Sequence, residues 1–236
     1  MFSRWAKRWA GLLILFAALL IGDQIRLGRP EYKYRLTIEV KTPQGVTSAS
    51  GVMSVHPNRG YTGTGSGGTR TKGDAIFVDL GGGRNVVMLL LHDASKASAD
   101  GMNYLPISAF AGVGRRVGFL EVRRQGDAVP VKGDALPLLV SLADPADPRS
   151  ARLLKPDDLE ATLGEGFGLQ GVTLAVVPTG WWPLDFGGAL GEPVTRGIDR
   201  TLPWALQPAS AAAALEAAGI VLAPAESDPT RAFRLE

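Results

Sequence analysis

The chain has 236 residues, 45% of them hydrophobic and 20% charged, and this balance excludes a wholly disordered protein. It has no cysteine, which excludes disulfides, thiolate metal sites, a cysteine nucleophile and lipid attachment through cysteine. The formal charge is +2, but removing Arg4, Lys7 and Arg8 from the 25 basic residues leaves 22 against 23 acidic ones. The rest of the chain has no basic excess, so we expect no nucleic-acid partner.

The first 25 residues predict a signal-anchor helix. Three positive side chains and no acid precede Ala10–Gly22, a run of 13 residues without a charge. Its eight large apolar side chains sum to roughly −2.4 to −4.8 kcal/mol on the insertion scale. We therefore expect the lipid bilayer to be a partner of this segment.

The length of the apolar run leaves two outcomes open. Thirteen helical residues reach only about 20 Å against a hydrocarbon core of about 30 Å, which is typical of a cleaved signal peptide. Cleavage after Gly22 or after Ala18, however, would place the large residues Leu20 or Phe16 where a small residue is required. An uncleaved helix can gain length if basic side chains snorkel and tryptophans lie at the headgroups. The residues expected at this membrane interface are Trp5, Lys7, Arg8 and Trp9. We expect a single-pass inner-membrane protein with its domain in the periplasm; the alternative is a cleaved, soluble periplasmic protein.

Residues 31–206 predict a β-rich domain. Apolar residues alternate with polar ones from Tyr34 to Lys41, as in a half-buried strand, and Thr42–Gly45 has turn residues. The unbroken apolar run Val86–Leu91 is typical of a strand covered on both faces. Further strands are predicted at 51–55, 75–80, 118–124, 136–142 and 172–177, and short helices at 156–163 and 210–219, with a helix or irregular link at 107–113 and at most a short helix within 192–206. The fold class is mainly β, an antiparallel sandwich or barrel-like domain with two or three short helices after the N-terminal apolar helix, and 207–236 is an Ala/Pro-rich appendage.

The sequence motifs that could indicate a catalytic, phosphate-binding or metal-binding site are weak. The glycine-rich stretch Gly63–Gly68 lacks the lysine and the following helix of a phosphate-binding loop. His56 and His92 are the only histidines and have no third ligand at a recognisable spacing, and no serine has the flanking glycines of a hydrolase nucleophile. We therefore predict no catalytic, cofactor-binding or metal-binding residues, and a non-enzymatic envelope protein is favoured.

Two surfaces are candidates for an envelope protein partner. The glycine-rich loop Gly60–Gly73 has too little apolar content to be buried. Trp181 and Trp182 are adjacent in a Gly/Pro-rich link, so at least one of them can be exposed, although both can also cover an end of the core.

The alternative function is a carboxylate-dependent hydrolase or carbohydrate-active enzyme. It would use carboxylates such as Asp74, Asp79 and Asp93, gathered in space from different strands.

Four segments resemble an uncharacterised alphaproteobacterial family of membrane-anchored or exported proteins. They are YRLTIEVKTPQG at 34–45, DAIFVDLG at 74–81, DDLEATLG at 157–164 and PVTRGIDRTLPW at 193–204. The resemblance covers most of Tyr32–Trp204 and implies a shared fold, but no activity, cofactor or catalytic residue. Pro178–Glu192 is longer than the link usual in that family.

Overall fold

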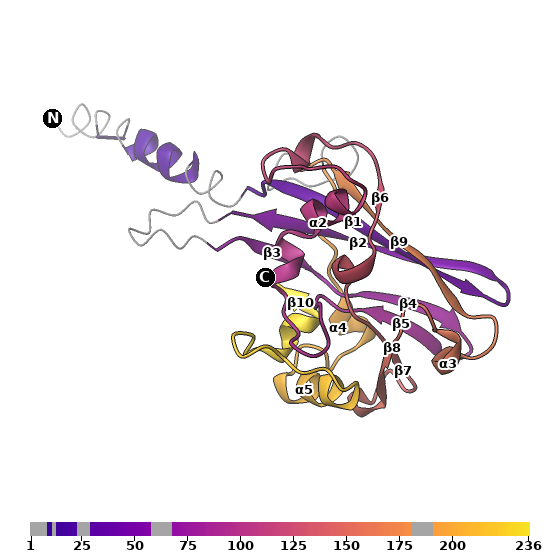
Figure 1. The fold of residues 1–236 in the computed structure, drawn as a ribbon. Helices are drawn as coiled ribbons and strands as arrows, with labels where there is room; N and C mark the ends of the chain where they lie inside the picture. The colour runs from indigo at the N-terminus through magenta and orange to yellow at the C-terminus, as the bar shows by residue number, and fades with distance from the viewer. Residues whose placement is uncertain (1–8, 11–12, 23–28, 58–67, 181–190) are drawn as a thin grey trace.

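The computed structural model describes residues 9–10, 13–22, 29–57, 68–180 and 191–236. Two antiparallel sheets form the domain (Figure 1), which confirms the predicted mainly β class. The strands of the six-stranded sheet, in spatial order, are β10 (Arg234–Leu235), β3 (Arg70–Asp74), β2 (Gly45–His56), β1 (Tyr32–Thr42), β9 (Gly168–Val177) and β6 (Val129–Pro130). Those of the four-stranded sheet are β4 (Ile76–Gly81), β5 (Arg84–Met88), β7 (Leu139–Leu142) and β8 (Ala151–Leu154).

Strand β1 is the centre of the larger sheet, as its alternating sequence predicts. Tyr34, Leu36, Ile38 and Val40 are fully buried on one face, because every second side chain of a strand points the same way. Thr42 pairs with Gly45 in the tight turn to β2, so the predicted turn is confirmed, although β2 begins earlier than the predicted strand at 51–55.

The chain passes from one sheet to the other within a single residue. Asp74 ends β3, Ile76 begins β4, and the N–H of Ala75 between them donates to the carbonyl of Phe233 at 2.8 Å. Ile76 then packs over Gly51 of β2, where a Cβ atom would lie 2.9 Å from Ile76 Cγ1. Residues of both sheets therefore share one hydrophobic core.

The β4–β5 turn shows why three consecutive glycines occur there. Gly81, Gly82 and Gly83 have φ angles of 77°, 62° and 78°, in the left-handed region that side chains disfavour. Since Gly81 pairs with Arg84, the two central residues form the tight hairpin turn that matches strand twist. The following run Val86–Leu91 is buried, as predicted, although the strand itself ends at Met88.

The described helices of the domain are short: α2 (Leu105–Gly112), α3 (Glu160–Leu163), α4 (Ile198–Thr201) and α5 (Pro208–Ala217), with 3-10 turns η1 (Asp100–Asn103), η2 (Val122–Arg124), η3 (Gly133–Ala135), η4 (Pro148–Ser150) and η6 (Pro229–Ala232). The sequence predicts two or three helices, and it predicts 156–163 as one helix, whereas only the final turn before Gly164 forms.

The predicted strand at 118–124 is wrong. This segment is a turn followed by η2, and the Glu121 carboxylate accepts a hydrogen bond from the N–H of Gly118 at 3.0 Å. The glycine and this local side-chain bond favour a turn over an extended strand.

Residues 207–236, predicted as an appendage, pack into the domain. Helix α5 buries Ala211 and Leu215, and Phe233 is 1% exposed. β10 pairs with β3, so the end of the chain forms an edge of the six-stranded sheet.

Residues 13–22 are helical and extend away from the domain (Figure 1). Their large apolar side chains are 52% to 70% exposed. In the chain as described, no helix combines the length and apolar character needed to cross a bilayer.

Candidate functional site

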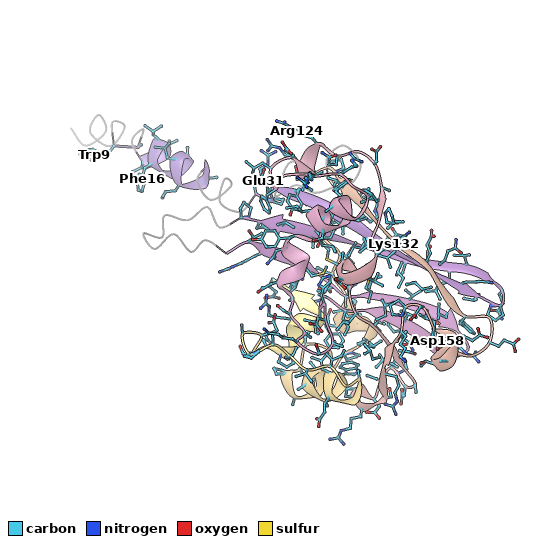
Figure 2. The ribbon with its side chains drawn as sticks, in the orientation of Figure 1. Trp9, Phe16, Glu31, Arg124, Lys132 and Asp158 are labelled. Atoms are coloured by element: carbon cyan, nitrogen blue, oxygen red, sulfur yellow. The ribbon has the colours of Figure 1, made fainter. Side chains whose placement is uncertain are left out.

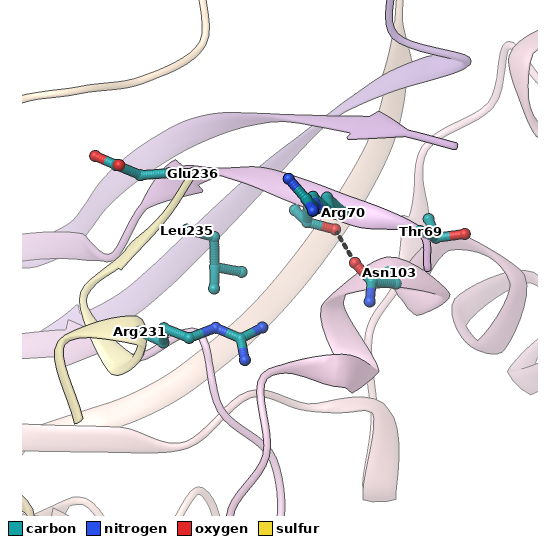
Figure 3. A pocket seen from close by; sticks show the side chains of 7 residues that line it. Thr69, Arg70, Asn103, Arg231, Leu235 and Glu236 are labelled. Carbon is teal, nitrogen blue, oxygen red and sulfur yellow. Dashed lines mark hydrogen bonds between the residues drawn. The ribbon is translucent and has the colours of Figure 1, made fainter. Parts of the chain in front are cut away.

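A polar pocket of about 290 Å³ lies where β3 begins and the chain ends (Figure 3). Its lining residues are Thr69, Arg70, Thr71, Asn103, Arg231, Leu235 and Glu236. These residues come from β3, η1 and the C-terminal segment, so the pocket joins parts of the chain that are far apart in sequence.

One wall of the pocket is fixed to the core by three hydrogen bonds. Thr71 Oγ1 donates to Asn103 Oδ1 at 2.9 Å, and Tyr32 Oη donates to the backbone oxygen of Asn103 at 2.9 Å. Tyr34 Oη donates to the backbone oxygen of Met102, also at 2.9 Å. Burial raises the pKa of both tyrosines, so both hydroxyls remain neutral donors at neutral pH. The wall formed by η1 is therefore held in place from beneath.

On the opposite wall, the positive charge of Arg231 is balanced by nearby carboxylates. Arg231 donates to the Glu226 carboxylate at 2.7 Å, and its other nitrogen lies 4.0 Å from Asp100. Glu226 is 5% exposed and also accepts from the N–H of Ala99 at 3.0 Å. Arg70 and Glu236, in contrast, are exposed at the pocket rim. The pocket thus offers hydrogen-bond donors and acceptors of both charge signs.

The described lining residues show which chemical groups the pocket offers. Its hydroxyls belong to Thr69 and Thr71, Glu236 supplies a carboxylate, and no histidine is among the lining residues that the structure describes. Among the described residues, no group of three or more His, Asp or Glu side chains could hold a metal ion. The geometry suits binding of a small polar group or of a peptide with charges of both signs.

Asp74 is the most strongly bound carboxylate described, but it has a structural role. Arg234 donates two hydrogen bonds of 2.7 Å to it, and Arg196 donates one of 3.0 Å. The N–H groups of Gly197 and Ile198 donate two more, at 2.7 and 3.0 Å. Burial raises the pKa of Asp74, but these bonds together hold that pKa below its ordinary value. The carboxylate therefore ties β3, β10 and the start of α4 together and is not available to a substrate.

The other predicted carboxylates also bind locally. Asp79 accepts from the N–H of Gly81 at 2.9 Å in the β4–β5 turn. Asp93 accepts from the N–H and hydroxyl of Ser95, which lowers the pKa of Asp93. No two of Asp74, Asp79 and Asp93 share a hydrogen-bond partner in the described chain.

The two histidines do not form a joint site. His56 Nε2 lies 2.8 Å from Ser54 Oγ, whereas His92 Nε2 donates to the carbonyl of Ala135 at 3.1 Å. Burial lowers the pKa of His92, although the Ala135 bond favours its charged form. The Nδ1 atom of His92 is the only buried side-chain polar atom of the described residues without a hydrogen-bond partner.

Most of the predicted contact residues fall outside the described part of the chain. Trp5, Lys7, Arg8, Trp181 and Trp182 lie there, and so does most of the predicted Gly60–Gly73 loop. Trp9 is described and is 52% exposed. The end of the predicted loop is wrong, because 70–73 belong to β3 and both Thr71 and Gly73 are buried. Thr69, Arg70 and Thr71 nevertheless line the pocket.

The described residues also outline a shallow groove of about 620 Å³ beside the end of β9. It is lined by Arg123, Arg124, Gln125, Gly126, Val176, Val177, Pro178, Thr179 and Gly180.

Asn103 and Arg231 are pocket residues that the sequence did not indicate, because neither lies in a motif and their proximity depends on the fold. The chain matches no protein-family model, no curated protein and no solved structure.

Proposed function

We propose that this protein is a membrane-tethered binding module, in which an N-terminal apolar helix holds a sandwich-like β domain at a bilayer and the domain binds an envelope component without catalysis. The observation that carries the proposal is the exposure of the apolar side chains in 13–22, from 52% to 70%. A helix that is apolar all round is stable only within lipid or within a protein core. The described domain does not cover this helix (Figure 1).

Lipid is a better partner for this helix than a groove on another protein. Residues 13–22, LILFAALLIG, contain no polar side chain, whereas a helix that docks in a groove usually keeps a polar face toward water. Arg4, Lys7 and Arg8 precede it and suit the headgroups at one end of a bilayer-embedded segment. We further propose that the membrane is the inner membrane and that the domain lies in the periplasm.

The binding role is supported by the pocket at the start of β3. Thr69 and Arg70 lie at the end of a glycine-rich segment, and Asn103 is held against the core behind them. Such an arrangement of an accessible loop end and a rigid wall is typical of recognition surfaces. The proposed partner is an envelope protein that presents a short polar segment to this pocket.

The tether is tested by vesicle flotation of the full-length chain. We expect flotation with neutral phosphatidylcholine vesicles, and loss of flotation in a Leu15→Asp/Leu19→Asp variant, because a central Asp costs about 2.5–3.5 kcal/mol on the insertion scale. The matched control is Val46→Asp/Val221→Asp, which changes two exposed valines of the domain. Equal flotation of both variants would contradict the tether.

Topology and partner are tested in cells. Full-length chain in the membrane fraction that becomes protease-sensitive in spheroplasts would support a periplasmic domain. A photo-crosslinking residue at Thr69 should capture an envelope protein, and Arg70→Ala should reduce that capture. Protease protection in spheroplasts would contradict the proposed topology, and crosslinking that is unchanged by Arg70→Ala would argue against this pocket.

A further inference from the structure

The segment 113–126 contains both apolar and basic side chains that are exposed. Leu120 is 63% exposed and Val113 is 41% exposed, although both are large apolar residues. Arg116 and Arg124 are exposed as well. Arg115 and Arg123 form ion pairs, but Arg116 and Arg124 have no ion-pair partner among the described residues.

This segment packs against the point where the chain enters the domain from the N-terminal helix. The Phe119 ring lies 5.1 Å from the Tyr32 ring in an edge-to-face arrangement, centroid to centroid. Arg123 Nη1 lies 3.3 Å from the carboxylate of Glu31. Figure 2 shows Arg124 and Glu31 toward the end of the domain from which the helix extends.

The length of the connection keeps this end of the domain near the bilayer. Gly22 ends the apolar run and Arg29 is the next described residue, seven residues further on. Seven residues span at most about 25 Å, since an extended chain advances about 3.5 Å per residue. A helix in the membrane therefore keeps Arg29 within about 25 Å of Gly22, and Tyr32, with the segment 113–126 packed on it, lies three residues further on.

Two segments at opposite ends of the domain differ in the sign of their net charge. The segment 113–126 has four arginines against one acid, Glu121, and Asp127 follows it. At the opposite end, the segment 155–166 has one lysine against four acids, Asp157, Asp158, Glu160 and Glu165. Figure 2 shows Asp158 far from the N-terminal helix. The basic segment thus lies toward the tether and the acidic segment away from it.

We propose that the segment 113–126 is a second membrane contact, in which Leu120 and Val113 enter the headgroup region and Arg116 and Arg124 bind the phosphates of anionic phospholipids. The groove lined by Arg123 and Arg124 leaves room for a headgroup beside these side chains. Exposed apolar residues in a segment that also carries exposed basic side chains are typical of interfacial membrane binding. The contact rests on the proposed tether, and it would fix the orientation of the domain so that the polar pocket keeps a defined position relative to the bilayer.

The experiment labels single positions on the full-length chain bound to vesicles. Because the chain has no cysteine, Leu120→Cys or Val46→Cys gives one unique site for an environment-sensitive fluorophore. Val46 is the matched control: it is 53% exposed and pairs with Lys41 near the far end of β1, about 30 Å from Tyr32. Flotation is measured first, and quenching by brominated lipid is then compared on phosphatidylcholine vesicles with and without phosphatidylglycerol.

We expect strong quenching at position 120 on vesicles with phosphatidylglycerol, weak quenching at position 46, and loss of the difference at high salt. Arg116→Gln/Arg124→Gln should lower the docking equilibrium about twenty-five-fold, since each basic side chain near an anionic surface is worth roughly fivefold. The control is Arg149→Gln/Arg200→Gln, which removes the same charge from exposed arginines elsewhere. This variant should leave the docking equilibrium unchanged.

Equal quenching at both positions on vesicles that carry the floated chain would overturn this contact and leave the tether intact. Quenching at position 120 that is unaffected by salt and by Arg116→Gln/Arg124→Gln would also overturn it. Failure of the unmodified chain to float would remove the tether and this contact with it. The unfolding midpoint of each variant distinguishes lost docking from a lost fold.

Discussion

The two ends of the chain differ in an instructive way. The N-terminal residues 13–22 are almost wholly apolar, yet their large side chains are 52% to 70% exposed. The C-terminal residues 207–236 are rich in alanine and proline, yet Phe233 and Leu235 are buried and β10 completes a sheet. Burial thus depends on whether a complementary surface is within reach, and not on the hydrophobicity of the segment alone. Within the described residues, the domain covers its C-terminal end but does not cover the N-terminal helix.

The largest expected effect concerns the charge that holds the C-terminal end. Asp74→Ala should lower the free energy of unfolding by about 3–5 kcal/mol, because it leaves Arg234 and Arg196 without their buried partner. Asp199→Ala is the control: this carboxylate also binds Arg234, but its side chain is 46% exposed, so its loss should lower the free energy of unfolding far less than that of Asp74. Chemical denaturation of the full chain in detergent measures both. Similar values for the two variants would show that the Asp74 cluster is not what anchors β10.

Replacing a phenylalanine with alanine at each end of the chain tests whether the two ends differ in how they pack on the domain. Phe233→Ala should cost about 3 kcal/mol of unfolding free energy, since the ring is buried and packs edge-to-face on Trp204 at 5.3 Å. Phe16→Ala, at a side chain that is 61% exposed, should change the unfolding of the domain by less than about 0.5 kcal/mol while weakening flotation with vesicles. A large effect of Phe16→Ala on domain unfolding would mean that the helix packs on the domain after all.

A smaller effect is expected in the loop on which the C-terminal segment packs. A Cβ atom at Gly101 would lie 2.6 Å from His92 Nδ1, so Gly101→Ala should cost about 1–3 kcal/mol by overpacking. Gly112→Ala is the matched control, because a Cβ atom there has no neighbour within 4 Å. Thermal unfolding of the two variants should separate them, and equal midpoints would argue that His92 moves aside without cost.

The smallest effect is a pH dependence. Burial lowers the pKa of His92 below 6.5 in the folded state, so the unfolded chain binds more protons in the window just below pH 6.5. The contribution of His92 to the free energy of unfolding is therefore fully present above pH 6.5, and it declines as the pH falls toward the pKa of His92 in the folded state. The Asp74 contribution is lost separately, below its ordinary value of 3.8, because its folded pKa is also lowered. His92→Gln should flatten the unfolding free energy just below pH 6.5, while His56→Gln serves as the control. A slope that survives His92→Gln would assign this window to another group.

Much of the fold could be predicted from the sequence where local patterns carry the signal. The alternation from Tyr34 to Val40 and the turn residues at Thr42–Gly45 predict the first strand and the turn after it, and both form. The strand predicted at 118–124 is wrong because the apolar residues of this segment are also typical of a strand. The hydrogen bond between Gly118 and Glu121 and the contact of Phe119 with Tyr32 favour a turn instead. Short apolar runs do not distinguish these outcomes without their tertiary neighbours.

The sequence by itself determined that an apolar N-terminal segment precedes a mainly β domain, because side-chain periodicity and charge are properties of neighbouring residues. Only the tertiary structure decided that Asp74 binds two arginines, that Asn103 and Arg231 line one pocket, and that the chain's end closes a sheet. Each of these depends on residues that are distant in sequence, such as Asp74 and Arg234. No local pattern specifies such pairs, since their proximity follows from how the two sheets enclose a common core.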